Sequence, residues 1–289
     1  MDPTGFEQWL RGAQGGRPKR TLVMGVLNVT PDSFSDGGRF ASREAAVAHA
    51  VEMAAAGADL IDVGGESTRP GSQPVPADEQ ARRVVPVIEA IGSRVPTVVV
   101  SIDTTRATVA EAALDAGATL VNDISAGRDD PGMLPMVAQR GAPIVLMHMQ
   151  GTPATMQDNP TYADVTAETI GFLRDRIAAA EAAGIAKERI LVDPGIGFGK
   201  SMNHNLELLR RQGELLALGR PVVIGTSRKG FIGRITNEPE PSRRLFGTAA
   251  SVAWSVANGA AVVRVHDVGP MAQVVRMIEA IRSGFAGDF

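Results

Sequence analysis

Polar side chains that can bind a charged ligand follow each of eight short, β-branched runs of the sequence. The runs end at Asn28, Asp62, Asp103, Asn122–Asp123, His148, Asp193, Ser227–Lys229 and Arg264–Asp267. In a parallel β/α barrel the carboxyl ends of all eight strands meet at one mouth, where barrel enzymes keep their active sites. The sequence therefore predicts one site that is assembled from the whole chain.

Cations gather after the last two runs. Lys229 follows one of them, and Arg264 and His266 stand two positions apart on the other, so their side chains share one face of a strand. Barrels often hold phosphate at these last two strand ends. An anionic ligand explains this cluster better than a solvated surface does.

Long segments rich in Gly, Pro, Ser and Asp follow the first two runs. Asn28–Gly38 carries many oxygen donors suited to Mg²⁺ and phosphate, and Gly64–Ser72 joins glycines and hydroxyls to the fork of Arg69. Either segment alone could be a surface turn. Long loops inside a compact domain are usually functional or mobile, and we expect mobile loops here.

Acidic and amide side chains end three other runs. Asp103 could cap the helix that follows it, whereas the amide of Asn122 both donates and accepts and can read the edge of a heterocycle. Asp193 opens the segment DPGIGFGK, in which Pro194 departs from a P-loop and Lys200 from a dinucleotide fingerprint. No nucleotide motif remains there, and Phe198 lies beside the mouth.

Composition excludes several classes of protein. The 289 residues are 44% hydrophobic and 21% charged, which suits one large α/β domain. The net charge of −3 does not indicate the basic surface that nucleic-acid-binding proteins carry. The absence of cysteine excludes disulfides, thiolate catalysis and zinc–thiolate sites. No apolar run has the length of a membrane span, and the first twenty residues lack the apolar core of a signal peptide. We expect a soluble, cytoplasmic protein.

Segments with helical periodicity separate the eight runs. They are Ser42–Ala56, Ala77–Ile91, Thr105–Ala116, Pro131–Arg140, Thr161–Ala183, Asn203–Leu218, Ser242–Asn258 and Pro270–Ser283. Eight alternating βα units favour a single (β/α)8 TIM barrel, with long mobile loops after strands 1 and 2, over an open sheet. We assign residues 21–289 to the barrel and residues 1–20 to a loosely held N-terminal extension. Extra apolar positions in Arg244–Asn258 and Met271–Arg282 predict a homodimer through these helices.

The motifs taken together resemble those of bacterial dihydropteroate synthases, which are pterin-binding TIM barrels. The matching segments are Asn28–Gly38, Asp62–Gly71, Ser101–Thr104, Asn122–Ser125, Asp193–Lys200, Ser227–Gly233 and Arg264–Val268. The match runs in order from about residue 21 to residue 284. This family joins 6-hydroxymethyl-7,8-dihydropterin diphosphate to 4-aminobenzoate in folate biosynthesis and releases diphosphate; sulfonamides mimic the second substrate.

The resemblance implies a role for each motif. Residues implied to bind the pterin or the diphosphate are Asn28, Thr68, Asp103, Asn122, Asp193, Lys229, Arg264, Val265 and His266. Residues implied to bind 4-aminobenzoate are Phe34, Thr68, Arg69, Pro70, Phe198 and Gly230. Residues implied to act in catalysis are Asp36, Arg69, Lys229, Arg264 and His266, with Mg²⁺ as cofactor on Asn28.

One position departs from the family pattern. Many members carry a serine directly after the lysine, where this chain has Gly230. The carboxylate of the aminobenzoate would then rely on the backbone amides at the start of the next helix.

Two other functions compete with the resemblance. A pterin-binding methyltransferase on a similar barrel would have no use for the anion-binding set of Arg69, Lys229, Arg264 and His266. A barrel that binds pterin without catalysis would be expected to have lost a ligand residue, and each expected pterin and diphosphate residue is present.

Overall fold

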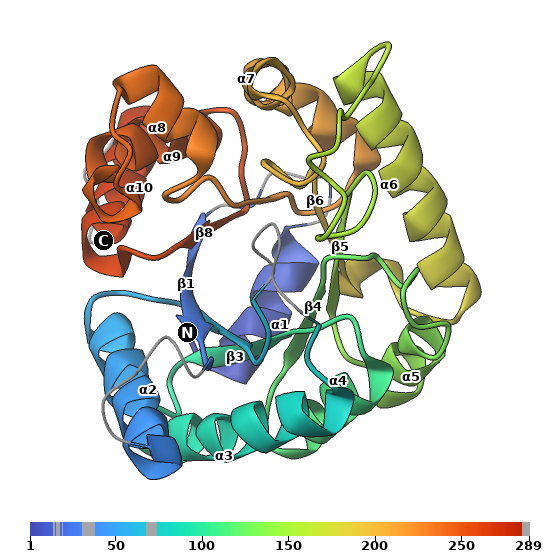
Figure 1. Cartoon of the computed structure of the whole chain (residues 1–289), viewed down its shortest axis with the longest axis vertical. Coiled ribbons are helices and arrows are strands. Elements are labelled where there is room, and N and C mark those ends of the chain that lie inside the picture. Colours follow the sequence, from blue (N-terminus) through green and yellow to red (C-terminus); the bar gives the residue numbers. More distant parts are fainter. Residues whose placement is uncertain (14, 16–17, 19, 31–37, 68–73, 285–289) are drawn as a thin grey trace.

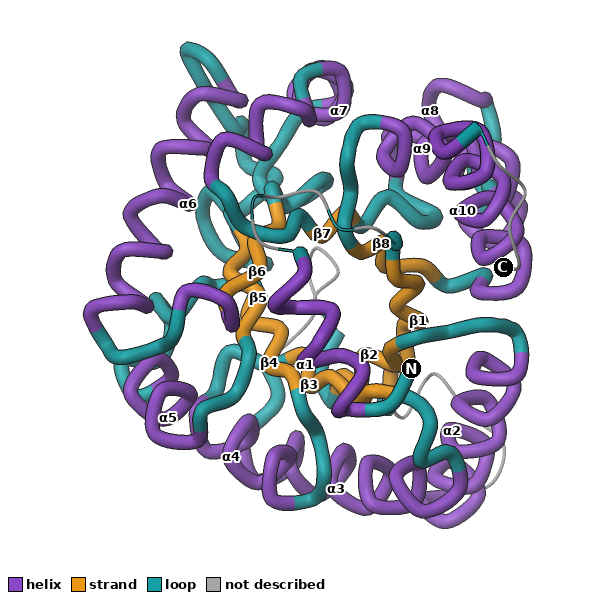
Figure 2. The backbone as a smooth tube through the Cα atoms, turned by 180° about the vertical axis from the view of Figure 1, so that it is seen from behind, coloured by secondary structure: helices purple, strands orange, loops and turns teal. Residues whose placement is uncertain are grey.

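Eight parallel strands surround the centre of the molecule, and helices surround the strands (Figures 1 and 2). The computed structural model describes residues 1–13, 15, 18, 20–30, 38–67 and 74–284, with the backbone alone for residues 38–42. The strands are β1 (Leu22–Asn28), β2 (Leu60–Gly64), β3 (Val99–Asp103), β4 (Leu120–Asp123), β5 (Ile144–Met147), β6 (Ile190–Asp193), β7 (Val223–Ile224) and β8 (Val262–Val265). Their order in the sheet is β6-β5-β4-β3-β2-β1-β8-β7. The predicted single TIM barrel is confirmed. Of the long loops predicted after strands 1 and 2, residues 31–37 and 68–73 lie outside the described residues, and residues 38–41 already belong to helix α2.

The barrel closes unevenly. β1 pairs with β2 over five residues, from Met24 opposite Leu60 to Asn28 opposite Gly64. Between β6 and β7 the described backbone forms one bridge, Val192 to Val222, beside a hydrogen bond from the Val192 N–H to the Pro221 carbonyl at 3.0 Å. We call this junction between β6 and β7 the seam.

The helices follow the strands in alternation. They are α2 (Gly38–Ala55), α3 (Ala77–Arg94), α4 (Ala107–Asp115), α5 (Met133–Arg140), α6 (Val165–Ala182), α7 (Met202–Arg210), α8 (Gly230–Thr236), α9 (Leu245–Ala257) and α10 (Val268–Ser283). The single helix expected over residues 203–218 is wrong, because α7 ends at Arg210 and a 3₁₀ helix, Gln212–Leu218, continues to the left-handed Gly219. No helix of the described chain is long and apolar enough to span a membrane.

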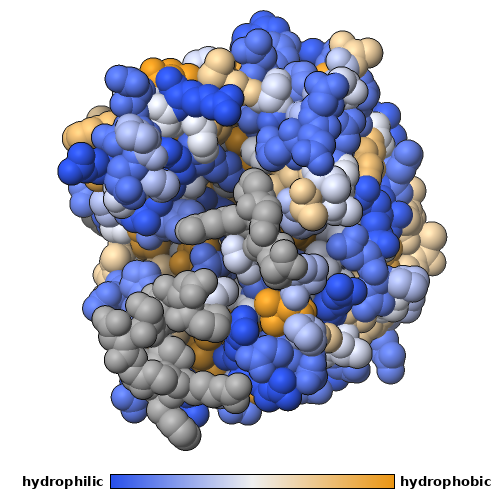
Figure 3. All heavy atoms as spheres, viewed as in Figure 1, coloured by the Kyte–Doolittle hydropathy of each residue, from blue (hydrophilic) through white to orange (hydrophobic). Residues whose placement is uncertain are grey.

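Apolar side chains form two layers that follow from the alternation along each strand. One face of the strands packs against the outer helices, and the other fills the barrel interior with residues such as Leu60, Val99 and Leu191. The interior layer gathers near the amino ends of the strands, so the carboxyl ends remain open for polar groups. The face around that open end is largely hydrophilic (Figure 3).

An additional helix, α1 (Pro3–Gly12), closes the other end of the barrel (Figure 2). Asp2 caps it by accepting from the Gly5 N–H at 2.7 Å, and Pro3 occupies its first turn. Phe6 and Leu10 are each 1% exposed and pack into the interior layer. The expectation that residues 1–20 are loosely held is therefore wrong for this helix, while the domain boundary at residue 20 stays a prediction.

Candidate active site

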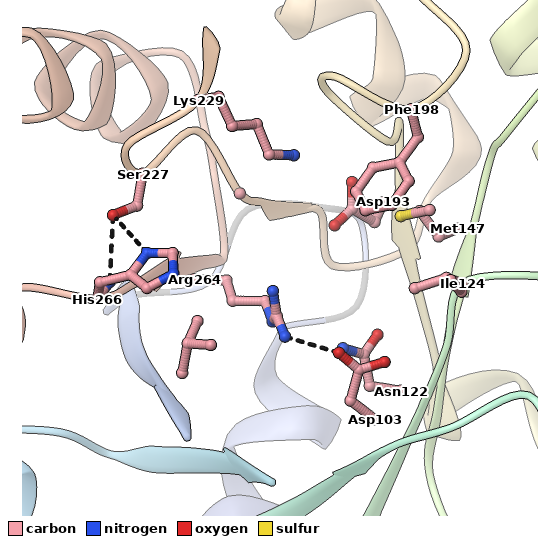
Figure 4. Close-up of a pocket in the computed structure, with 12 residues that line it drawn as sticks. Asp103, Asn122, Ile124, Met147, Asp193, Phe198, Ser227, Lys229, Arg264 and His266 are labelled. Carbon is pink, nitrogen blue, oxygen red and sulfur yellow. Dashed lines mark hydrogen bonds and ion pairs between the residues drawn. The ribbon is translucent and has the colours of Figure 1, made fainter. Parts of the chain in front are cut away.

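A pocket opens at the carboxyl ends of the strands and encloses about 450 Å³ of empty space, its open mouth included. Residues from seven strands or the loops directly after them line it (Figure 4). They are Val26, Asp103, Asn122, Ile124, Met147, Asp193, Phe198, Gly225, Ser227, Lys229, Arg264 and His266. The convergence predicted from the strand ends thus produces one pocket.

Arg264 lies at the base of this pocket, between two carboxylates. Its Nε donates to Asp62 Oδ2 and its Nη2 to Asp103 Oδ2, each at 2.7 Å (Figure 4 draws the second bond). Asn122 Nδ2 donates to the same Asp62 oxygen at 2.9 Å. Asp62 is fully buried, and its Oδ1 has no hydrogen-bond partner among the described residues. Four side chains from four strands are therefore locked into one network.

Burial and charge shift the pKa values in this network. Burial raises the pKa of Asp103 to about 7, against the opposing effect of Arg264, and the nearby Asp62 carboxylate raises it further. Burial by itself lowers the pKa of Arg264, but the carboxylates of Asp62 and Asp103 raise it above its ordinary value. Arg264 is thus a fixed cation, while Asp103 is poised to titrate near neutrality.

Asp193 and Lys229 face one another across the pocket (Figure 4). Asp193 Oδ1 accepts from the Gly195 N–H at 2.7 Å, which fixes the carboxylate. Lys229 Nζ donates to the Ile196 carbonyl and lies 4.7 Å from the centre of the Phe198 ring. Burial lowers the pKa of Lys229 to about 8, although Asp193 opposes the shift, and burial raises the pKa of Asp193.

The glycines of the loop after β6 allow its close packing. Gly195 has φ +67°, and a Cβ there would lie 1.9 Å from the His148 carbonyl oxygen. Behind the loop, the buried Lys200 contacts His148 Nδ1 and the Phe198 carbonyl, both at 2.9 Å. Burial lowers the pKa of His148 to about 3, with the Lys200 charge acting in the same direction. His148 therefore supports the loop from behind.

Ser227 and His266 join the ends of β7 and β8. Ser227 Oγ accepts from the His266 N–H at 3.1 Å and lies 3.0 Å from Nδ1 of the same residue. Both bonds appear in Figure 4, where they hold the imidazole at the rim of the pocket. The two contacts restrain both the backbone and the ring of His266.

The structure separates the predicted site residues into three groups. Those brought together in the pocket are Asp103, Asn122, Asp193, Phe198, Lys229, Arg264 and His266. Those described but not lining it are Asn28, Val265 and Gly230. Those outside the described residues are Phe34, Asp36, Thr68, Arg69 and Pro70. The roles assigned to all of them stay predictions.

Strand alternation explains why Val265, one of the three described residues that do not line the pocket, is absent from it. The Val265 side chain is fully buried among the outer apolar residues, on the opposite face to Arg264 and His266, so it does not point into the pocket. Asn28 ends β1 with its Oδ1 close to Gly64, 3.6 Å from the position of a Cβ there. Gly230 begins α8, and a Cβ on it would meet no atom within 4 Å.

Sequence reasoning missed several pocket residues and one partner. Met147 and Ile124 are apolar, so in the sequence they cannot be told apart from residues of the hydrophobic core. Asp62 was noted only as the end of a run, although it organises Arg264 and Asn122. The only signal was its position two residues before Gly64, on the face that points inward.

The metal proposed from the sequence can be tested against the donors present. The described part of the chain holds no group of three or more His, Cys, Asp or Glu side chains arranged for a metal ion. Asn28 offers one carboxamide oxygen, a hard donor of the kind that Mg²⁺ accepts when substrate phosphates and water complete its shell. The donor chemistry of Asn28 therefore fits one ligand of Mg²⁺.

Comparison with known proteins agrees with this geometry. Residues 24–266 match the family described as pterin binding enzyme. The dihydropteroate synthase of Escherichia coli strain K12 is 48% identical over 261 residues, which cover 90% of this chain and 92% of that protein. The solved structure of Xanthomonas albilineans dihydropteroate synthase with 4-aminobenzoic acid has a TM-score of 0.87 and 46% identity, covering 94% of this chain and 97% of that one. The same enzyme in complex with 7,8-dihydropteroate has a TM-score of 0.84 and 44% identity, covering 94% and 98%. Family match, identity and fold agree over most of the chain, which therefore belongs to the pterin-binding enzyme family.

Proposed function

We propose that this chain is a dihydropteroate synthase, a transferase that joins 6-hydroxymethyl-7,8-dihydropterin diphosphate to 4-aminobenzoate and releases diphosphate. One observation carries the proposal. The pocket combines hydrogen-bonding carboxylates and an amide, from Asp103, Asn122 and Asp193, with the cations of Lys229 and Arg264. A ligand with a flat edge of donors and acceptors and a strongly anionic tail matches this combination.

The pterin ring is recognised by hydrogen-bonding side chains of the pocket. Asp193, fixed by the Gly195 N–H, accepts N–H groups from the pyrimidine edge, and Lys229 donates to its carbonyl side. Asn122 adds an amide held in place by Asp62. A ring with the wrong pattern would leave buried polar groups unpaired, which is a costly outcome and the physical source of specificity.

Arg264 and His266 promote catalysis by stabilising the leaving diphosphate. The bond between the pterin methylene carbon and the diphosphate oxygen breaks, and the leaving oxygen takes the electron pair. The electron-rich pterin shares the positive charge left on carbon. The neutral aryl amine then forms the C–N bond and loses one proton to solvent. Arg264, already oriented by Asp62 and Asp103, and His266, restrained by Ser227, stabilise the departing charge without reorganising.

The remaining parts of the proposal come from the sequence. Asn28 would hold Mg²⁺, which takes up negative charge on the diphosphate when bound. The assignments carried by the family resemblance alone are Asp36 and Arg69 in catalysis, Thr68 in both subsites, and Phe34, Pro70 and Gly230 for the aminobenzoate. The cytoplasmic location also remains part of this proposal.

We further propose a homodimer. Trp254 on α9 and Met277 and Ile281 on α10 are 49%, 60% and 62% exposed. Trp254 also lines an apolar groove between α7, α8 and α9, to which Leu206 and Ile235 contribute. Large apolar side chains on the same outer helices that the sequence indicated support a second copy as the partner.

The decisive experiment is to incubate the purified chain with the dihydropterin diphosphate, 4-aminobenzoate and Mg²⁺ and to follow 7,8-dihydropteroate and diphosphate. Formation of both in equal amounts is expected, with loss of turnover on chelation and recovery with added Mg²⁺. Pterin binding without product would favour a non-catalytic barrel. Transfer of methyl from methyl-folate would favour the methyltransferase instead.

A further inference from the structure

Arg228 has an unusual backbone for its position in the chain. It stands between Ser227 and Lys229, which both line the pocket, yet it does not line the pocket itself. Its φ is +59°, in the left-handed region that side chains with a Cβ rarely adopt. Such strain persists only where the surroundings enforce it, and it is concentrated at functional sites.

The surroundings of Arg228 do enforce this conformation. Its N–H donates to Thr248 Oγ1 at 3.1 Å, and its carbonyl accepts from Arg244 Nη1 at 2.9 Å. Its guanidinium forms a bidentate fork with Asp267, with Nε to Oδ2 at 3.0 Å and Nη2 to Oδ1 at 2.5 Å. The main chain and the side chain are both held from outside the turn.

The Asp267 side chain is also used for the contact with Arg228. It directly precedes α10 at the position of the helix cap, where an aspartate is normally favoured because it accepts from the first backbone amides. Its carboxylate makes no such cap bond and pairs with Arg228 instead. The side chains of the pair are 32% and 21% exposed, so the fork lies on the outer side of the turn.

The hydrogen-bonded ladder between β7 and β8 does not reach the turn at Ser227–Lys229. The ladder between β7 and β8 ends with Ile224 opposite Val263, three residues before Ser227. Beyond it, two neighbouring contacts connect the β7 and β8 ends, namely Ser227 with His266 and Arg228 with Asp267. Each contact joins one residue of the turn to one residue directly after β8.

We propose that the Arg228–Asp267 pair is a positioning device that fixes the turn after β7, so that Ser227 and Lys229 point into the pocket and His266 keeps its place. This inference rests on the proposed function and deepens it. Neither member of the pair touches substrate. Both act through the three pocket residues beside them: Ser227 and Lys229, on either side of Arg228, line the pocket, while the Arg228 side chain pairs with Asp267 outside it.

The test compares steady-state kinetics of four variants with the wild type. Asp267→Asn keeps the shape of the fork and removes its charge. Arg228→Gly removes the fork and also the strain, because glycine adopts positive φ freely, so we expect this variant to fold even if the first does not. The double variant closes a thermodynamic cycle. Glu214→Gln is the matched control, since it makes the same carboxylate-to-amide change in the bidentate fork with Arg211, which lies away from the pocket.

The expected result is a fall of about 10- to 100-fold in kcat and in kcat/KM for Asp267→Asn and Arg228→Gly, because misplacement by about 1 Å has effects of this order. KM should change by less than about threefold, and the melting temperature of Arg228→Gly should stay near that of the wild type. The double variant should lose no more than the worse single variant, because the two residues act as one unit.

Two outcomes overturn the inference while leaving the proposed function intact. One is a wild type that forms dihydropteroate and variants that match Glu214→Gln within about twofold. The other is additive losses in the double variant, which mean that the two residues act independently. A wild type without turnover instead contradicts the proposed function itself.

Discussion

Asp193 and Lys229 show how single residues acquire their chemistry from burial. Asp193 lies within the pocket with one oxygen already engaged by the Gly195 N–H. Lys229 loses part of its hydration, so its pKa falls to about 8. The position of both residues at strand ends could be predicted from the sequence. Their mutual orientation could not, because it depends on glycines 195 and 197, whose positive φ values fold the loop back against β5 and Lys229.

Asp193→Asn should abolish most of the pterin affinity. An amide cannot accept two N–H groups at once, so one ring donor would meet an N–H group, at a cost of about 2–4 kcal/mol. Calorimetric titration with a pterin measures this loss, with Asp78→Asn on the exposed side of α3 as the control. Unchanged pterin affinity in Asp193→Asn would place ring recognition elsewhere.

The pH dependence of kcat/KM should have an alkaline limb set by Lys229. In the proposed function the cationic form donates to the substrate, and the pKa of about 8 means that this form is lost as the pH rises through 8. The pKa of Lys229 lies below the ordinary lysine value of 10.5, so the limb appears well below the usual range of lysine. A profile from pH 6 to 10 should show the limb in the wild type and lack it in Lys229→Met. Persistence of the limb in that variant would assign it to another group.

At the scale of elements, the regular strands and most helices were predictable and the short or terminal elements were not. Eight β-branched runs marked the strands because buried strands need such residues on both faces. Helix α1 escaped notice because it buries only Phe6 and Leu10, four residues apart, within a polar and glycine-rich stretch. Helix α8 has seven residues, two of them glycine, and offers too little periodicity to detect.

Helix α1 should contribute substantially to stability. Phe6→Ala removes a side chain that is 1% exposed inside the barrel end, and such truncations cost about 3–5 kcal/mol. Chemical denaturation measures the free energy of unfolding, with Val51→Ala, 38% exposed on α2, as the control expected to change it little. A loss below about 1 kcal/mol for Phe6→Ala would mean that α1 does not hold the barrel closed.

At the scale of the whole molecule, the barrel itself follows from the alternation of βα units. The alternation does not show which apolar side chains of the outer helices are exposed. The outer helices near the chain end expose Phe246, Met277 and Ile281 by 86%, 60% and 62%. The sequence showed that these helices have surplus apolar positions. It could not show which positions face outward, because that depends on how each helix is rotated against the sheet.

The homodimer proposal predicts twice the chain mass by light scattering at micromolar protein concentration. Met277→Arg should shift the species toward monomer, because burying an unpaired charge in an apolar interface is costly. Val51→Arg places the same charge on α2, away from the proposed interface, and should leave the mass unchanged. A monomeric wild type, or a Met277→Arg variant that remains dimeric, would contradict an interface through α10.

The seam between β6 and β7 places the least hydrogen-bonded part of the described sheet beside Asp193 and Lys229, the proposed pterin-binding residues. Asp193 ends one side of it, and Lys229 follows the other. Backbone amides of β7 should therefore exchange with deuterium sooner than those of β1 and β2, where the ladder runs over five residues. If pterin binds to Asp193 and Lys229 as proposed, it contacts both sides and should slow this exchange more than it slows exchange in β2 or β3. The substrate would then link β6 to β7 where few backbone hydrogen bonds do so. Hydrogen-exchange mass spectrometry with and without pterin measures the resulting protection of the β7 amides.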